Sequence, residues 1–151
     1  MKFRIEFIPE EAAEEIVLYC HSLDENTKKQ SEAIEAMLED RPAIIYYKQE
    51  QEFYLPSKDV LFFETDGETV HAHTREDVFK VNYRLYQLED ILPSDFLRIS
   101  KSTVCNTGQV LSLSKTLGAS VLVQFFGTKK QVYASKLYAK SLKETLSKRR
   151  R

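Results

Sequence analysis

A short polar run, made of Arg98, Ser100, Lys101 and Ser102, carries the side chains of this sequence that are best suited to hold a ligand. The run follows the helix-breaking Pro93 and lies between apolar residues. Guanidinium, ammonium and hydroxyl groups hold phosphate oxygens, whereas a catalytic site usually gathers acids, bases and nucleophiles. The residue types therefore predict contact with the phosphate backbone of DNA.

A second candidate segment, Ser135–Lys140, lies closer to the C-terminal end of the sequence. Ser135 is a predicted helix N-cap, and Lys136 and Lys140 lie on the polar side of the helix that would follow. The free N–H groups and the positive dipole end of a helix N-terminus suit a phosphate group. A capping serine and a solvated helix face explain the same pattern without a ligand.

Basic residues are concentrated in the C-terminal part of the chain, although the formal net charge is only −1. Residues 1–41 hold five Lys or Arg and eleven Asp or Glu, a net charge of −6. Residues 96–151 hold twelve Lys or Arg and one acid, a net charge of +11, and +7 remains without Lys148–Arg151. This asymmetry predicts a basic surface for a polyanion in the C-terminal half.

Motifs of catalytic, metal and nucleotide sites are not found in the sequence. It lacks a nucleophile elbow, a Gly-rich phosphate loop and the H-E-x-x-H motif, and it has only four glycines. His71 and His73 share one face of a predicted strand, but no third metal ligand is evident near them. We therefore expect no enzyme activity, no cofactor and no metal, with both histidines at the surface or in cross-strand pairs.

Length and apolar content indicate one ordinary domain with a small appendage, because the chain has 151 residues of which 42% are hydrophobic. Its two cysteines, Cys20 and Cys105, cannot form a disulfide framework, and we expect two small buried side chains in a reducing compartment. No apolar run approaches the length of a membrane span, and the N-terminus lacks a signal-peptide core. These features predict a cytoplasmic protein without membrane insertion.

The elements that position the polar segments follow an acidic N-terminal appendage, residues 1–41. This appendage is predicted to be a small α+β unit, and the domain boundary is predicted at Arg41–Ala43. Its expected elements are a half-buried strand over the alternating Lys2–Ile8, a segment Glu10–His21 that fits either helix or strand, and a helix Glu25–Glu39 with Asp24 as N-cap and Arg41-Pro42 at its end.

From Ile44 onward, strand-like runs recur at short intervals with turn residues between them. The connections are too short for parallel crossovers, so we expect antiparallel sheets, a mainly β domain over residues 44–147 and a basic tail at 148–151. Turns are predicted at Asp66-Gly67, Leu117-Gly118 and Gly127-Thr128. The predicted elements are strands at Ile44–Lys48, Glu52–Leu55, Val60–Glu64, Thr69–Thr74, Asp77–Val81, Phe96–Ile99, Val110–Leu113, Ser120–Phe126 and Gln131–Ala134, and helices at Arg84–Leu92 and Lys136–Ser147.

The strand over Phe96–Ile99 is expected to end near Ser100. A longer strand would turn Lys101 towards the same side as the apolar Ile99, which is unfavourable. Lys101–Thr103 is therefore predicted to form an exposed loop. Such a loop can enter a groove of DNA, although a polar turn without a ligand gives the same pattern.

Four motifs, in this order and spacing, resemble the LytTR family of DNA-binding domains. The resemblance covers the chain from Tyr46 to Ser147. The motifs are V-L-F-F-E (Val60–Glu64), L-x-x-L-E-x-x-L-P (Leu85–Pro93), F-L-R-I-S-K-S-T-V-C-N (Phe96–Asn106) and V-Y-A-S-K-L-Y (Val132–Tyr138).

The resemblance implies an elongated arrangement of small antiparallel β-sheets whose inter-strand loops enter successive major grooves. It also implies a stand-alone bacterial regulator, because residues 1–41 are too short for a receiver domain. Its implied partners are double-stranded DNA with promoter repeats, a second copy in a homodimer, and a regulatory membrane protein. The appendage would then serve dimerisation or regulation.

The resemblance also assigns DNA contacts to individual residues. Lys101 and the turn near Glu68 or Thr69 are expected to face bases, although Lys101 could also contact phosphate alone. The other predicted DNA contacts are Arg98, Ser100, Ser102, Ser135, Lys136 and Lys140.

These observations together predict a sequence-specific, DNA-binding transcriptional regulator that contacts major grooves through inter-strand loops. The alternative is a protein-interaction module, such as an anti-activator, that uses the same fold to bind a partner. The acidic appendage motivates this alternative, and a gel shift with the promoter region separates the two.

Overall fold

The computed structural model describes residues 1–38 and 43–149, and the chain divides into two compact units, Met1–Asp40 and Arg41–Arg151. Each unit is described by itself. The predicted helix end at Arg41-Pro42 and most of the predicted boundary Arg41–Ala43 lie outside the described residues.

The described part of the N-terminal unit, residues 1–38, contains one helix, α1 (Glu25–Leu38). Asp24 begins it as predicted, because its Oδ1 atom accepts a hydrogen bond from the backbone N–H of Thr27 over 2.8 Å. The same hydrogen bond lowers the pKa of the Asp24 carboxyl below its usual range. Thr27 is buried in this helix, whereas Met37 and Leu38 at its end are exposed.

The strand predicted over Lys2–Ile8 is not formed. Residues 1–24 contain a turn, closed by a 3.0 Å hydrogen bond from the N–H of Ala12 to the carbonyl of Pro9, but neither helix nor strand. The alternating pattern is present, yet a strand also needs a neighbour to pair its backbone groups. The ambiguous segment Glu10–His21 is likewise neither helix nor strand.

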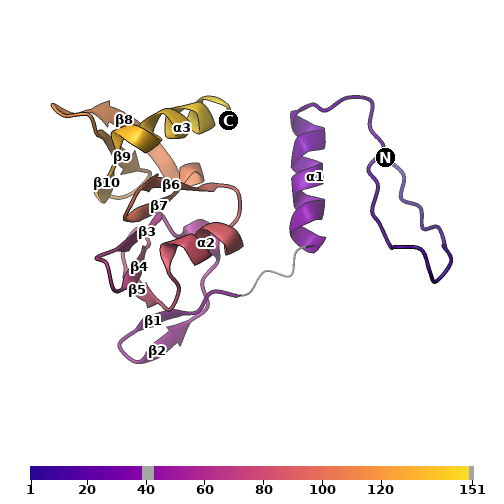
Figure 1. The fold of residues 1–151 in the computed structure, drawn as a ribbon, viewed down its shortest axis with the longest axis horizontal. Coiled ribbons are helices and arrows are strands. Elements are labelled where there is room, and N and C mark those ends of the chain that lie inside the picture. Colours follow the sequence, from indigo (N-terminus) through magenta and orange to yellow (C-terminus); the bar gives the residue numbers. More distant parts are fainter. Residues whose placement is uncertain (39–42, 150–151) are drawn as a thin grey trace. The chain divides into compact units, whose positions relative to one another are not determined.

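Residues 43–149 of the C-terminal unit contain two antiparallel sheets, shown in Figure 1. A seven-stranded sheet has the order β2-β1-β5-β4-β3-β7-β6, and a three-stranded sheet has the order β10-β9-β8. The expectation of a mainly β fold with antiparallel pairing is confirmed. The strands are β1 (Tyr46–Lys48), β2 (Gln51–Phe53), β3 (Phe62–Thr65), β4 (Val70–His73), β5 (Val78–Val81), β6 (Phe96–Ser100), β7 (Thr103–Asn106), β8 (Val110–Lys115), β9 (Val121–Phe125) and β10 (Gln131–Ala134).

Helices accompany both sheets of this unit. They are α2 (Leu85–Ile91), α3 (Lys136–Ser147) and two short 3-10 turns, Ser57–Asp59 and Thr107–Gln109. The prediction of α3 is confirmed at both ends, with Leu142 buried on its inner face. Ser135 precedes α3 as predicted, but its side chain makes no capping hydrogen bond.

Strand β7 was not predicted, and the exposed loop predicted over Lys101–Thr103 is wrong at Thr103. Thr103 is buried and already pairs with Glu64 of β3 and Ser100 of β6. Because β7 lies between β3 and β6, all four of its side chains are buried, and the alternation that identifies a half-exposed strand is lost.

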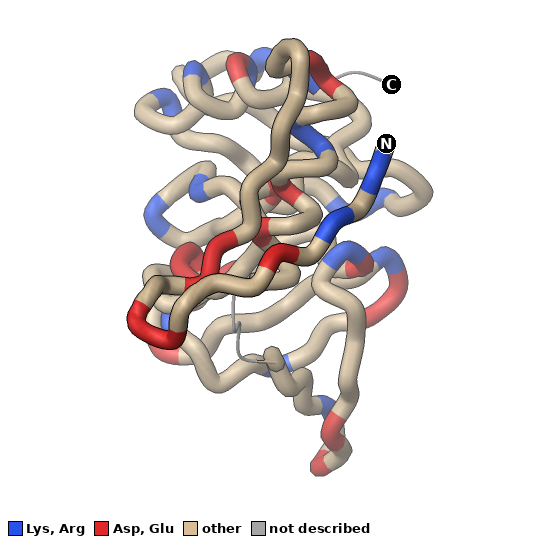
Figure 2. Tube along the Cα trace, turned by 90° about the vertical axis from the view of Figure 1, so that its right-hand side faces the viewer, with Lys and Arg blue, Asp and Glu red and all other residues tan. Residues whose placement is uncertain are grey.

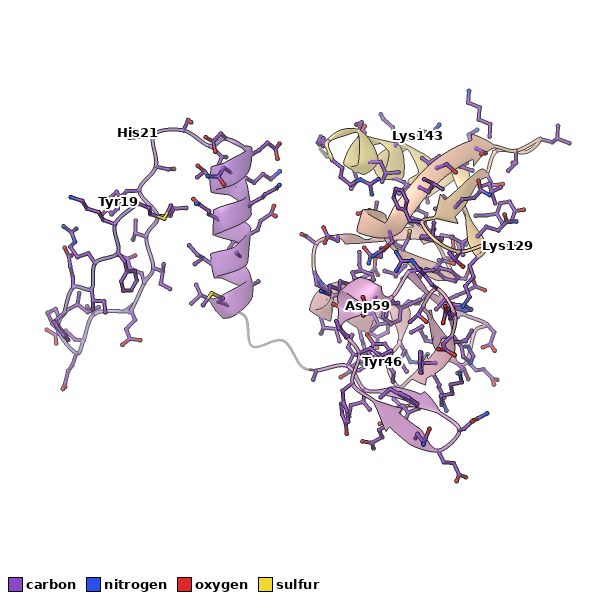
Figure 3. All side chains as sticks on the ribbon, turned by 180° about the vertical axis from the view of Figure 1, so that it is seen from behind. Tyr19, His21, Tyr46, Asp59, Lys129 and Lys143 are labelled. Carbon is purple, nitrogen blue, oxygen red and sulfur yellow. The ribbon has the colours of Figure 1, made fainter. Side chains whose placement is uncertain are left out.

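The seven-stranded sheet separates two apolar cores, and neighbouring residues of one strand contribute to different cores. Phe63 and Val104 face the core beneath α2, where Tyr46 is fully buried (Figure 3). Phe62 and Cys105 face the other core, which the three-stranded sheet and α3 close. In that core the rings of Phe62 and Phe125 stack with centroids 5.5 Å apart. The ends of strands from both sheets are thereby held in fixed relative positions.

Candidate nucleic-acid interface

Two of the predicted contact segments lie side by side at one end of the seven-stranded sheet. The turn between β3 and β4 contains Glu68, and the turn between β6 and β7 contains Lys101. The backbone N–H of Thr65 donates to the carbonyl of Ser102 over 2.9 Å, which joins the bases of the two turns. The sheet therefore presents both turns together.

The third predicted segment, at the start of α3, is held against the same end of β6. The backbone N–H of Ser135 donates to the carbonyl of Ile99 over 2.8 Å. Strand β10 ends at Ala134, so its last residue and the first turn of α3 lie next to the end of β6. We call the three segments Glu68–Thr69, Ser100–Ser102 and Ser135–Lys136 the turn cluster.

The β3–β4 turn is shaped by Asp66 and Gly67, as predicted. The Oδ1 atom of Asp66 accepts hydrogen bonds from the N–H groups of Glu68 and Thr69, over 3.1 Å and 3.0 Å. These bonds lower the pKa of the Asp66 carboxyl. Gly67 has a φ of 108°, which other residues rarely adopt. The side chain of Glu68, within this turn, is therefore exposed to solvent.

The β6–β7 turn is shaped by serines and leaves its lysine exposed. The N–H of Ser102 donates to the Oγ atom of Ser100 over 3.2 Å, and the two hydroxyl oxygens are 3.3 Å apart. Lys101 and Ser102 are exposed, whereas Ser100 is half-buried. Lys101 therefore stands at the tip of the turn, where it can reach a ligand.

Arg98 was predicted to contact phosphate, but its guanidinium is engaged within the chain. Nε donates to the carbonyl of Ser100 over 2.7 Å and Nη2 donates to the carbonyl of Lys101 over 2.5 Å. Nη1 pairs with the carboxylate of Glu89 over 3.0 Å, and the side chain is only 21% exposed. These contacts make Arg98 the residue that fixes the shape of the β6–β7 turn.

The polar side of α3 adds cations to the turn cluster. Lys136 and Lys140 are exposed, as predicted. Together with Lys115 of β8 and Lys143 of α3, they line a cleft between the β8–β9 hairpin and the helix. Figure 3 shows Lys143 on α3. Lys115 was not among the predicted contacts, because only the fold brings it next to α3.

The distribution of charge along the chain can be followed in Figure 2, with Asp and Glu in red and Lys and Arg in blue. Among the residues of the predicted basic tail, Arg149 folds back. Its Nη2 atom donates to the carbonyl of Val110 over 2.9 Å, and Nη1 donates to the carbonyl of Thr107. This part of the tail anchors α3 to the start of β8.

His73 and Cys105 are packed against the interior of the C-terminal unit. The ring of His73 stacks on Phe62 with centroids 4.4 Å apart, and burial, followed by Lys130 and His71, lowers its pKa to about 4. Within residues 1–38 and 43–149, no cluster of three metal-ligating side chains is found. Cys105 is buried, and burial raises the pKa of its thiol to about 12. The prediction that Cys20 is buried is wrong, because Cys20 is exposed in a segment without a core.

The fold is a mainly β domain whose antiparallel sheets gather polar turns and cations at one sheet end. The sequence profile of the LytTr DNA-binding domain matches residues 50–147. The chain therefore belongs to the LytTr DNA-binding domain family, and the predicted resemblance is confirmed. This family is defined by DNA binding and not by a reaction.

Relatives from Staphylococcus aureus extend the similarity. An uncharacterized HTH-type transcriptional regulator of strain bovine RF122 / ET3-1 is 33% identical over 111 residues, which are 73% of this chain and 74% of the relative. One of strain NCTC 8325 / PS 47 is 28% identical over 148 residues, 97% of this chain and 99% of the relative. The similarity to the second relative therefore includes the N-terminal unit.

A solved structure supports the fold. The LytTr DNA-binding domain of a Bacillus cereus protein superimposes with a TM-score of 0.63 at 19% identity, covering 70% of this chain and 97% of that domain. Among the described residues of this chain, no helix is long and apolar enough to cross a membrane.

Proposed function

We propose that this protein is a transcriptional regulator that binds specific DNA sequences by inserting the turn cluster into the major groove. The observation that carries the proposal is the joining of three sequence-distant segments by two backbone hydrogen bonds, Thr65 to Ser102 and Ser135 to Ile99. Family membership and the transcriptional regulators among the relatives support it.

The side chains of the turn cluster, together with Arg98 and Lys140, divide into three roles. Lys101 and Glu68 stand at exposed turn tips and face base edges, where an ammonium donates to guanine O6 or N7 and a carboxylate accepts from cytosine N4. Thr69 lies beside Glu68 at the base of the same turn. Arg98 and Ser100 hold the β6–β7 turn in shape. The phosphate contacts are Ser102, Ser135, Lys136 and Lys140.

The charges of the two turns favour this division. Asp66 and Glu68 make the β3–β4 turn acidic, so it is repelled by phosphates and stabilised only where a base offers a donor. The lysines of α3 lie beyond the β6–β7 turn, because the start of this helix is joined to the end of β6, and they are attracted to the DNA backbone. Phosphate contacts of this kind fix the register, and base contacts provide the specificity.

Selection of bound sequences from a random DNA pool, followed by fluorescence anisotropy on the selected site, tests the proposal. We expect a preferred site, tighter binding to it than to a scrambled duplex, and a steep loss of affinity with rising salt from counterion release. Folded protein that retards no DNA at low salt would contradict it.

A second candidate function, a partner-binding regulator with the same fold, is favoured by one observation. Most of the large apolar side chains of residues 1–24 are exposed, as in a segment that binds another protein. The same anisotropy measurement decides between the two, because this candidate requires no preferred DNA site.

A further inference from the structure

The N-terminal segment, residues 1–24, leaves many large apolar side chains in solvent. Phe3 is 90% exposed, Ile5 is 70% exposed and Phe7 is 98% exposed. Further exposed apolar residues of the segment are Ile8, Ile16, Val17, Tyr19 and Leu23. Such an accumulation in so short a segment marks an interaction surface.

Residues Lys2–Ile8 have the pattern of a strand but no strand partner. Phe3, Ile5 and Phe7 alternate with charged residues, which places all three on one side of an extended chain. Arg4 and Glu6 lie together on the other side, where they form an ion pair of 2.9 Å within the chain. Among the described residues, no β-ladder includes this segment. Both of its edges can therefore accept another strand.

We propose that Lys2–Ile8 pairs antiparallel with the same segment of a second copy of this chain, with Ile5 facing Ile5 at a two-fold axis. In this register Arg4 faces the partner's Glu6 twice, once on each side of the axis. Phe3 faces the partner's Phe7 in the same way. From Phe3 to Phe7 the segment thereby forms an isologous interface in which every facing pair is either apolar or of opposite charge, and Lys2 faces the partner's Ile8 at each end.

Other registers are less favourable. A shift by two residues places Arg4 opposite Arg4 or Glu6 opposite Glu6. A parallel pair in register places both of these like-charge pairs opposite each other. A shift by one residue turns the apolar side of one copy towards the charged side of the other. The antiparallel register centred on Ile5 is the one that satisfies both sides.

A second copy is also a better partner than the chain's own following segment. The chain turns back at Pro9–Ala12, and Figure 1 shows the segments on either side of this turn as an open loop without strand arrows. A closed hairpin on this turn would place Glu6 opposite Glu15, two like charges. The segment after the turn, which carries Tyr19 and His21 (Figure 3), therefore lacks the charge complementarity that Lys2–Ile8 has with itself.

Charge reversal tests this interface, with the dimer dissociation constant of the full chain measured by sedimentation equilibrium. Arg4→Glu alone and Glu6→Arg alone each turn two attractive pairs into repulsive ones, so the constant is expected to rise about tenfold or more. The double variant R4E/E6R restores opposite charges and the dimer. An equimolar mixture of the two single variants is expected to form a heterodimer.

The single variants do not threaten the fold, because the side chains of Arg4 and Glu6 are 73% and 66% exposed. A wild-type chain that stays monomeric at every concentration would overturn the proposal. So would a mixture of Arg4→Glu and Glu6→Arg that stays as dissociated as its components.

Disulfide trapping tests the register independently. In a Cys20→Ser background, Ile5→Cys places two thiols across the two-fold axis within disulfide reach, and oxidation is expected to give a covalent dimer. The matched control Ile8→Cys lies six positions from its copy, about 20 Å along the strands, and is expected to stay monomeric. Equal cross-linking of both variants would overturn the register. Binding to a single DNA site, measured in parallel, reports separately on the DNA-binding proposal.

Discussion

The backbone N–H of Thr65 donates to the carbonyl of Ser102 over 2.9 Å, one step beyond the last β3–β7 ladder pair, Glu64 and Thr103. The spacing of the two turns at the proposed DNA interface is therefore set by a β-ladder and not by flexible loops. Base readout needs side chains held in a fixed geometry. The sheet supplies this before DNA is bound.

Lys101→Ala is expected to weaken binding to the preferred DNA site by about 1–3 kcal/mol and binding to random DNA by less, because a base contact is lost. Fluorescence anisotropy on both duplexes measures the difference. Lys129→Ala is the matched control, since Lys129 is an exposed lysine in the turn between β9 and β10, at the other end of β10 from Ser135 (Figure 3). An equal loss on both duplexes would make Lys101 a phosphate contact.

Lys136→Ala and Lys140→Ala are expected to weaken binding to all DNA sequences by similar amounts. Each removes one phosphate contact, so the slope of the logarithm of the binding constant against the logarithm of salt concentration should become shallower by about 1 per lysine. Titrations at four or more salt concentrations give this slope. A variant that loses specificity but keeps the wild-type slope would place that lysine against a base.

Elements that have one apolar face and one solvent-exposed face, or a clear turn motif, are predicted well from the sequence. Helix α3 is found at the predicted residues, Lys136–Ser147, and the Asp66-Gly67 turn joins β3 and β4 as expected. Both depend on local signals, namely helical spacing of apolar residues and a backbone position suited to glycine.

Other features depend on neighbours that the sequence does not show. Strand β7 is buried on both faces, so its pattern lacks alternation. Lys2–Ile8 has the alternation but no strand beside it within the described chain. The turn cluster itself could be assembled from the sequence only through the family resemblance, because its segments are joined by contacts between residues 36 or more positions apart. The residue types gave no indication that Arg98 would pair with Glu89 and donate to two backbone carbonyls.

Stability is expected to depend on pH through His73, whose pKa is lowered to about 4 from an ordinary value of 6.5. Between these values the unfolded chain takes up a proton that the folded chain excludes, so the free energy of unfolding falls as pH decreases from about 6.5 to about 4. His73→Phe keeps an aromatic ring against Phe62 and removes the titrating group. Urea unfolding at several pH values should show a weaker pH dependence in the variant. Parallel profiles for both proteins would assign the effect to other groups.

Arg98→Ala is expected to impair DNA binding by deforming the β6–β7 turn and not by removing a phosphate contact. The variant loses the hydrogen bonds to the carbonyls of Ser100 and Lys101 and the ion pair with Glu89. The free energy of unfolding should fall by about 1–2 kcal/mol in urea titrations.

Affinity of Arg98→Ala for the preferred site should fall as well, while the salt slope of binding stays at the wild-type value, because no phosphate contact is removed. Arg98→Lys keeps the charge, but a single ammonium cannot reach three separate acceptors as the guanidinium fork does. It is therefore expected to resemble the alanine variant. Wild-type affinity for Arg98→Lys, together with a shallower salt slope for Arg98→Ala, would show instead that Arg98 contacts the DNA backbone.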